Sequence, residues 1–421
     1  SWGGCMELTQ NITTGFSVSE DNCILYKTKF LVKEGSTEYI TTSDYVYFGD
    51  RYQTVEPMKH GAYIGVSGVA RKVKKIYVGV NGAARKVKKA YIGVGGVARL
   101  CFSGGGEVVY SGELTPYPKT TSYVSAVNFN KKLLCVGGVS PLNTVIYGYS
   151  NSLTLEEMIP KLSVERYKTI NISTENHCFI SGGNRSGSIM SNALDVLDVS
   201  FVATASELST AKSDHAAVRV GNYVLFCGGY INSSKMTNTI DCFDDSSLVR
   251  TNPFTLNTAG ACFGASLEEC AILSEWISSG VYHCYRIDSS LTHTFQTLDK
   301  GGAMNTLGRY AVIRCNNSNT IIAVDSSFTL LNMPESSFTF SNTRNNVTNV
   351  LEGNLMITNG QVSTSVESYD ELFTKKMLQD APYTKNRCAT GVVGDYALFI
   401  AGISTTSSSS YTNTVFHYGI L

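Results

Sequence analysis

Long hydrophobic runs and an excess of charge of one sign are both missing from this 421-residue sequence. The longest apolar runs, such as "YALFIAGI", reach about eight residues where a membrane-spanning helix needs about 20, so we expect no membrane insertion. The 34 Lys and Arg residues balance 34 Asp and Glu residues. A neutral chain excludes the simplest electrostatic case for nucleic acid binding. The start at Ser1, without a charged and apolar leader, indicates a processed product or a piece of a longer chain.

Metal-ligand spacing is also missing from the cysteines and histidines. Twelve cysteines are present, and five of them lie in or beside apolar, strand-like runs. We interpret them as small buried side chains in a reducing compartment, with a local Cys5–Cys23 bridge as the alternative. We therefore expect no metal and no cofactor. The five strand cysteines are Cys135, Cys178, Cys227, Cys270 and Cys315; the histidines are His60, His177, His215, His283, His293 and His417.

What the sequence does contain is a long internal repeat. From about residue 114, an apolar strand that ends in small residues recurs, most clearly as "KLLCVGG", "HCFISGG" and "YVLFCGG". A polar loop, another strand, an Asp-Ser type turn and a bulky apolar residue follow each copy. Asp and Ser favour tight turns because their short side chains accept hydrogen bonds from the backbone two residues further on. The bulky residues are Leu153, Phe201, Leu248, Leu291, Phe328 and Phe373.

Four short strands per roughly 45 residues, with Gly-Gly closing the second, are typical of a propeller blade. Over residues 107–421 the sequence resembles kelch-repeat β-propellers, and residues 215–244 are the best single copy. One departure is that Leu or Phe stands where that family usually has Trp. The resemblance implies an all-β fold with seven blades. Because the last copy lacks its fourth strand, we expect 107–114 to pair with 415–421 and close the ring.

A different repeat precedes the propeller. Between residues 61 and 106 a tyrosine recurs every 14 residues, followed by Ser-Gly, Asn-Gly or Gly-Gly between β-prone runs. Such dipeptides are the strongest short hairpin signal, because both central residues must take positive φ. We predict three hairpins that together form a small antiparallel meander. Residues 1–60 also contain strand-like runs and are interpreted as a β-rich attachment or adaptor region.

The segment "ARKVKK" occurs twice in this meander and supplies eight cations. A solvated strand face that protects sheet edges is the interpretation we favour. Contact with an acidic partner subunit is the second, and nucleic acid is the third, because little aromatic surface accompanies the charges. The cations are Arg71, Lys72, Lys74, Lys75, Arg85, Lys86, Lys88 and Lys89.

The tandem units also resemble segments of tail and other virion-associated proteins of phages and prophages of gut Gram-positive bacteria. This resemblance covers about 45 residues of low complexity, at residues 61–106. It implies a virion protein made in the bacterial host cytoplasm, which contacts other virion subunits through residues 1–106. By analogy with phage attachment proteins, we expect a homo-oligomer. The propeller would then be the part that binds a glycan or protein on the host surface.

Recognition on a propeller usually lies on loops carried by the rigid scaffold. Aromatic residues in long loops can stack on sugar rings, and a basic residue near the start of five inner strands would ring the channel mouth as an anion or acidic-glycan site. Ordinary blade-edge packing and surface charge are the alternative interpretations. The aromatic candidates are Tyr230, Trp276, Tyr282 and Tyr411, and the basic candidates are Arg166, Lys212, Lys300, Arg344 and Arg387.

Catalysis finds less support in the sequence. The histidines lie at unrelated positions in their repeats, which does not suit a copper oxidase of this fold. The Asp-Ser turns lack the Gly-x-Thr-Trp continuation of sialidase repeats. We therefore expect a protein that is not an enzyme, with a carbohydrate-active kelch enzyme or a bacterial carbohydrate-binding propeller as the alternative.

Overall fold

The computed structural model describes residues 108–421 except 279, 341–346, 359–362, 372, 404–410 and 421. In the first 107 residues it describes the backbone of ten strands. The chain divides into two compact units, Ser1–Glu107 and Val108–Leu421. The predicted all-β class is confirmed, since the one helical segment among the described residues is the short 3-10 helix η2 (Ser186–Ser188). No helix in this described part has the length and apolar character needed to cross a membrane.

Strands of the first unit form one four-stranded sheet and three hairpins. The sheet has the order β2-β3-β1-β4. Its strands are β1 (Phe30–Glu34), β2 (Tyr39–Thr42), β3 (Tyr45–Gly49) and β4 (Tyr52–Val55). The hairpins pair β5 (Tyr63–Val66) with β6 (Val69–Lys72), β7 (Ile76–Val80) with β8 (Ala83–Val87), and β9 (Lys89–Val94) with β10 (Val97–Ser103).

Strands pair on both sides of each dipeptide that the sequence indicated, with pairs Val66↔Val69, Val80↔Ala83 and Val94↔Val97. The predicted meander is not seen, because among the described strands the hairpins form three separate two-stranded sheets. A two-residue turn determines the pairing of its own two arms and leaves the next hairpin unconstrained. The 14-residue period therefore agrees with the three hairpins. It does not agree with one sheet that contains all three of them.

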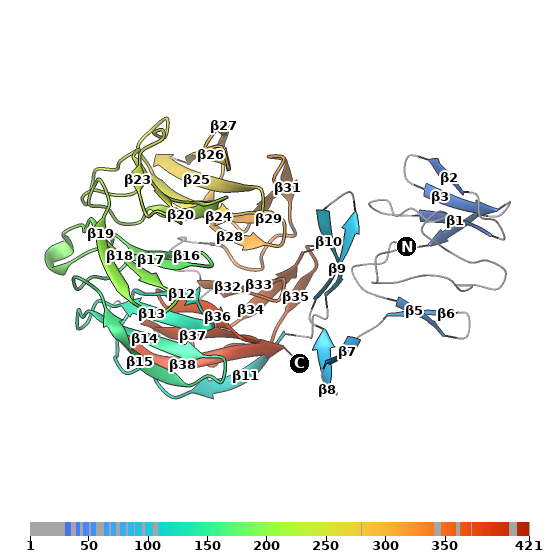
Figure 1. The fold of residues 1–421 in the computed structure, drawn as a ribbon, viewed down its shortest axis with the longest axis horizontal. Helices are drawn as coiled ribbons and strands as arrows, with labels where there is room; N and C mark the ends of the chain where they lie inside the picture. Colours follow the sequence, from blue (N-terminus) through green and yellow to red (C-terminus); the bar gives the residue numbers. More distant parts are fainter. Residues whose placement is uncertain are drawn as a thin grey trace. The chain divides into compact units, whose positions relative to one another are not determined.

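The second unit is a ring of seven four-stranded antiparallel sheets, the blades of a β-propeller (Figure 1). Blades 1 to 3 contain β12 (Val124–Phe129), β13 (Lys132–Gly137), β14 (Val145–Ser150), β15 (Leu155–Lys161), β16 (Ile170–Ser173), β17 (His177–Ser181), β18 (Ala193–Asp198), β19 (Ala203–Glu207), β20 (Ala216–Val220), β21 (Tyr223–Cys227), β22 (Ile240–Asp244) and β23 (Arg250–Thr251).

Blades 4 to 6 follow the same order of parts. They contain β24 (Ala261–Ser266), β25 (Cys270–Ser278), β26 (Val281–Asp288), β27 (His293–Leu298), β28 (Gly302–Leu307), β29 (Tyr310–Cys315), β30 (Ile321–Val324), β31 (Leu330–Asn332), β32 (Val347–Leu351), β33 (Asn354–Thr358), β34 (Val366–Asp370) and β35 (Lys375–Met377). In blades 1 to 6 the first strand is innermost. These inner strands contact one another from blade to blade around the ring.

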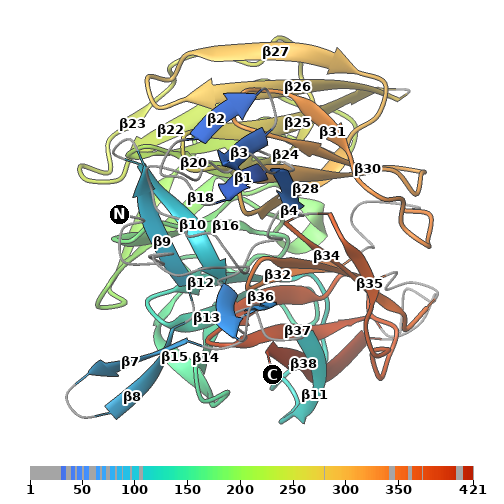
Figure 2. The same cartoon turned by 90° about the vertical axis from the view of Figure 1, so that its right-hand side faces the viewer.

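Blade 7 closes the ring as the sequence predicted. It has the order β36 (Ala389–Val393), β37 (Tyr396–Ile403), β38 (Tyr411–Ile420) and β11 (Val108–Leu114). The outermost strand β11 comes from the start of the propeller and runs antiparallel to β38, from Val108↔Ile420 to Leu114↔Val415. Figures 1 and 2 both show teal β11 beside red β38. This pairing leaves the last blade with the same four strands as the others.

The repeated Asp-Ser turns join the third and fourth strands, and their bulky residues act as wedges between blades. In blade 2 the Asp198 carboxylate accepts hydrogen bonds from the amides of Ser200 (2.8 Å) and Val202 (2.9 Å). Phe201 then takes φ +59°, and its ring meets that of Phe129 in blade 1 at 5.8 Å, edge to face. All six bulky residues have φ between +55° and +67° and pack on a core cluster. Packing between blades thus offsets the backbone strain.

The Gly-Gly pairs that end the second strands seal the same interfaces near the ring axis. The amides of Gly183 and Gly229 donate to backbone carbonyls of the next blade at 3.0 and 2.8 Å, and Gly402 of the Ala-Gly pair in blade 7 does so at 2.9 Å. The first glycine of each pair approaches that blade even more closely. A Cβ on Gly228, whose φ is +60°, would lie 2.6 Å from the Gly260 carbonyl oxygen. Glycine is therefore needed both for positive φ and for space.

The nine cysteines whose side chains the structure describes are free, and eight of them are buried. They include all five that the sequence placed in strands, so their interpretation as buried apolar side chains is confirmed. Burial raises the pKa of the Cys227 thiol to about 12, which keeps it protonated and unreactive. Cys5 and Cys23 lie outside the described residues.

Substituting Gly228 tests the seal. We expect Gly228→Ala to lower the free energy of unfolding by about 3 kcal/mol or more, because strain and overpacking add. The matched control is Gly187→Ala, where φ is +70° but no atom lies within 4 Å of the new Cβ. It should lose about 1 kcal/mol from backbone strain alone. Urea unfolding monitored by near-ultraviolet circular dichroism makes the comparison, and equal losses would contradict the proposed close approach.

A second substitution tests the wedge. Phe201→Ala should lower the free energy of unfolding by about 2–4 kcal/mol, because it removes an aromatic contact between blades 1 and 2. The neighbouring Val202 is 60% exposed. Val202→Ala should therefore change stability by less than about 0.5 kcal/mol. Thermal unfolding of the two variants side by side is the measurement, and similar melting temperatures would show that the wedge does not stabilise the interface.

Candidate binding site at the mouth of the central channel

A cavity of about 380 Å³ lies among inner strands of blades 1, 5, 6 and 7. Blades 1 and 5 are not neighbours, so this space lies at the ring axis and is part of the central channel. Its lining side chains are neutral, and most are polar. They are Asn128, Asn305, Thr306, Thr348, Asn349, Val350, Thr390 and Val392, with the backbone of Gly391.

Hydrogen bonds between neighbouring blades use many of these channel groups. The Thr348 hydroxyl donates to the Asn305 amide oxygen at 2.8 Å, and the Thr390 hydroxyl donates to the Thr348 carbonyl at 2.8 Å. Asn349 donates to the Gly391 carbonyl at 2.9 Å. The wall is therefore polar, uncharged and largely satisfied, which suits holding blades together better than binding an ion.

The mouth of the channel is the end at which the inner strands begin, and it has a different chemistry. The residue triplets 121–123, 166–168, 212–214 and 385–387 lead into the inner strands of blades 1, 2, 3 and 7. In each triplet the first residue is buried, with at most 2% of its surface exposed. The third residue is partly buried and has φ between +51° and +56°. Each triplet thus pairs one enclosed side chain with one that stands at the mouth.

Two of the basic candidates, Arg166 and Lys212, are the buried first residues of these triplets. The prediction that they ring the mouth is therefore wrong. Arg166 lies 2.6 Å from the Asp195 carboxylate and also donates to the Ile180 carbonyl at 3.0 Å. Lys212 lies 2.9 Å from Asp241 and donates to the Phe226 carbonyl at 3.0 Å. Neither side chain is exposed. A third-strand carboxylate neutralises each cation inside the blade, which the sequence did not reveal.

Burial and pairing act on these groups in opposite directions. Desolvation lowers the pKa of Arg166, and the neighbouring Asp195 carboxylate offsets part of that shift. Burial also raises the pKa of Asp241, but the charge and hydrogen bond of Lys212 outweigh it, and the net pKa is lowered.

Lys385 is the equivalent residue of blade 7, and its surroundings differ. Its ammonium group lies 5.2 Å from the centre of the Phe416 ring, where blades 2 and 3 have a carboxylate. It donates to the carbonyls of Phe399 (3.3 Å) and Thr414. Burial lowers its pKa to about 8, only partly opposed by Cys388 and Glu113. Of the three buried cations Arg166, Lys212 and Lys385, only Lys385 has an aromatic ring in the place of a carboxylate partner.

The third residues of blades 7, 1 and 2 meet at the mouth. The Lys168 ammonium lies 4.9 Å from the centre of the Tyr123 ring, and the Arg387 guanidinium carbon lies 5.0 Å from the same ring. The Tyr167 ring lies 5.9 Å from that of Tyr123 and 6.0 Å from the Lys168 ammonium. We call Tyr123, Tyr167, Lys168 and Arg387 the mouth cluster. It places two cations and two aromatic rings together at a partly exposed surface.

Of the predicted basic ring, only Arg387 belongs to this cluster. Lys300 is exposed and lies 3.4 Å from the Thr320 hydroxyl, and Arg344 lies outside the described residues. The sequence missed Tyr123 and Lys168. Aligning the repeats on the start of each inner strand, "YVSAV", "KTINI", "DHAAV" and "RCATG", would have placed both in one column with Arg387.

The aromatic candidates do not form a common platform. Tyr282 is buried, and its hydroxyl accepts a hydrogen bond from Asn316 at 2.9 Å, so it belongs to the core. Tyr230, Trp276 and Tyr411 are partly buried in blades 3, 4 and 7. No ring contact among the described residues joins these three.

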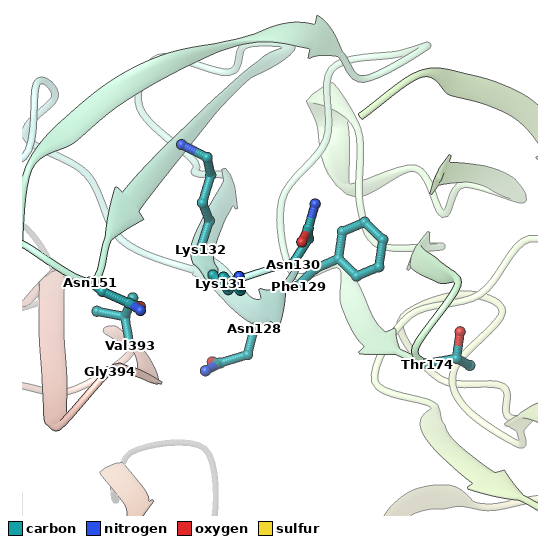
Figure 3. A pocket seen from close by; sticks show the side chains of 9 residues that line it. All are labelled: Asn128, Phe129, Asn130, Lys131, Lys132, Asn151, Thr174, Val393 and Gly394. Atoms are coloured by element: carbon teal, nitrogen blue, oxygen red, sulfur yellow. The ribbon is translucent and has the colours of Figure 1, made fainter. Parts of the chain in front are cut away.

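Two other polar clusters lie away from the mouth. In blade 4, Glu275 accepts hydrogen bonds from Thr258 (2.8 Å) and Tyr285 (3.0 Å), and His283 lies 3.3 Å away. Burial raises the pKa of this carboxyl, which is completely enclosed and offers no access to a substrate. At the opposite end of the ring, a cavity of about 170 Å³ lies among turns of blades 1, 2 and 7 (Figure 3). It is lined by Asn128, Phe129, Asn130, Lys131, Lys132, Asn151, Thr174, Val393 and Gly394.

The basic residues of the first unit are described only as backbone. Arg71 and Lys72 lie in β6, Arg85 and Lys86 in β8, and Lys89 in β9. The remaining three, Lys74, Lys75 and Lys88, fall outside the described residues.

Comparison with known proteins adds little beyond the fold. No protein-family model matches the chain, and no curated protein matches it. A solved structure titled "Structure of YjhT" is similar, with 10% identity and a TM-score of 0.46. The match covers 72% of this chain and 96% of that chain. What the propeller does must therefore be argued from its own residues.

The pH dependence of stability tests the account of Lys385. Its pKa is about 8 in the folded protein and near the usual 10.5 when unfolded. Between these values the unfolded chain holds more protons, so folding stability rises as pH rises through this window. We expect the free energy of unfolding of the wild type, relative to that of Lys385→Met, to increase between about pH 8 and pH 10. Below pH 8 the difference between the two proteins should not change with pH. A difference between the two free energies of unfolding that stays constant over the whole pH range would contradict the lowered pKa of Lys385.

Proposed function

We propose that this chain is a phage virion or tail-associated structural protein, without enzymatic activity, that displays its β-propeller for recognition of a host-surface glycan or protein. The mouth cluster is the observation that carries this proposal. It presents aromatic and cationic side chains, partly exposed, on a closed ring whose blades are held by packing and hydrogen bonds. Recognition groups on a rigid scaffold lose little entropy on binding.

The blades are kelch repeats in this proposal. The left-handed Gly-Gly pairs, the third-to-fourth strand turns and the closure by an N-terminal strand support it. None of these features depends on the Trp that the repeats here lack, because Leu or Phe forms the wedge instead.

Attachment to the virion belongs to the first unit. Residues 1–106 contact other virion subunits, and the hairpins at 63–103 resemble the tandem units of phage and prophage tail proteins. Residues 61–106 contain nine Lys and Arg residues and no Asp or Glu, which favours an acidic partner surface. A homo-oligomer would present several propellers at once and raise the avidity for a repetitive host surface.

Immunogold electron microscopy of particles from the native source tests this proposal. An antibody against the propeller should label tails or capsids, and the purified full-length chain should bind intact host cells. Recovery of the chain only as a free monomer in bacterial lysate, with no cell binding, would contradict it. The channel would then be assayed for hydrolysis of polysaccharides, the activity expected of a carbohydrate-active kelch enzyme.

A further inference from the structure

We infer that the mouth cluster binds an acidic polysaccharide, with Arg387 and Lys168 on negatively charged groups and the tyrosines against sugar rings. This inference rests on the proposed function, because it names the chemistry of the host surface that the propeller recognises. It concerns the blades 7, 1 and 2 side of the mouth.

Charge is the first reason. No salt bridge joins Lys168 or Arg387 to a carboxylate among the described residues, whereas the buried cations Arg166 and Lys212 each have one. Packing over a tyrosine ring occupies one face of a guanidinium, or one side of an ammonium group, and leaves other N–H donors to point elsewhere. A guanidinium can present two of its donors to one carboxylate or phosphate.

Backbone conformation is the second reason. Tyr123, Lys168 and Arg387 have φ of +56°, +55° and +51°, a region that costs a non-glycine residue about 1–2 kcal/mol. At the six wedges, Leu or Phe packs against a hydrophobic core cluster, which offsets such strain. At the mouth, the cations Lys168 and Arg387 pack instead on the ring of Tyr123. Strain of this kind is typical of sites where a side chain must be held in one place for binding.

Spacing is the third reason. The Tyr123 amide donates to the Arg387 carbonyl at 2.9 Å, and the Lys168 amide donates to the Tyr123 carbonyl at 3.4 Å. These bonds connect three neighbouring blades, so the two cations stand on either side of Tyr123 along the ring. A polymer with regularly spaced negative groups can contact both at once.

The neighbouring position limits where the polymer lies. In blade 3 the third residue is Asp214, whose carboxylate accepts a hydrogen bond from the Ser213 hydroxyl at 3.3 Å. A negative charge there repels an acidic ligand. The channel cavity among blades 1, 5, 6 and 7 has only neutral lining residues. The ligand is therefore expected to run from blade 7 to blade 2 and to stop short of blade 3.

Binding of the full-length chain to defined polymers tests this inference. The probes are polygalacturonate for carboxylate groups, phosphomannan for phosphate groups and dextran as a neutral polymer, measured by biolayer interferometry. We expect binding to one or both acidic polymers, weakening with added salt, and none to dextran. The polymer that binds more tightly identifies the source of the charge. Failure of both acidic polymers to bind, or equal binding to dextran, would overturn the inference.

Variants then assign the site. Lys168→Gln and Arg387→Gln should each weaken binding about tenfold or more, since each removes a charge-assisted hydrogen bond. Tyr123→Leu should weaken it without a change of charge. The charge-matched control is Lys131→Gln with Lys376→Gln, one at the opposite end of the ring and one on outer strand β35, both exposed. Unchanged melting temperatures show that the variants are folded, and equal binding by the control and the Lys168→Gln, Arg387→Gln double variant would overturn the assignment.

The same variants separate this inference from the proposed function. If the double variant binds host cells as well as the wild type does, the inference fails and host recognition by another surface stands. If the wild type binds the acidic polymer but neither cells nor virions, host recognition fails and the acidic-polymer site stands.

Discussion

Pairing of β11 with β38 is the interaction on which the rest of the propeller depends. The seven residues of β11 come first in the propeller sequence, and they form the outer strand of its last blade. Without them blade 7 would end in an unpaired edge. Closure brings Arg387 of blade 7 beside Tyr123 of blade 1, although 264 positions separate them in the chain. The mouth cluster therefore exists only because the ring is closed.

Ten of the non-glycine residues with positive φ fall into two groups, six wedges and four positions at the mouth. At the six wedges Leu or Phe packs against a hydrophobic core cluster, and that packing offsets the strain of positive φ. The four positions at the mouth carry Tyr, Lys, Asp and Arg instead. The first group stabilises contacts between blades, and three members of the second group belong to the proposed binding site.

Buried cations lie directly beneath the mouth and form part of its support. Arg166 and Lys212 donate to backbone carbonyls of second strands and pair with third-strand carboxylates. Each therefore connects the segment that leads into an inner strand with the body of its own blade. Lys385 makes the same backbone contacts in blade 7 without the carboxylate. The residues two positions further on are thereby held at the mouth by buried, directional contacts.

The sequence by itself determined the local parts of this protein. The Asp-Ser turns, the Gly-Gly ends of strands, the three hairpin turns and the missing fourth strand of the last blade are all local signals, because turn chemistry depends on residues a few positions apart. Which of the basic residues are exposed was decided only by tertiary structure. Arg166 and Lys168 are two positions apart in one triplet, yet Asp195 buries the first while Tyr123 of the next blade holds the second at the surface. Those partners come from other strands and another blade, and a one-dimensional repeat does not state which residues the closed ring brings together.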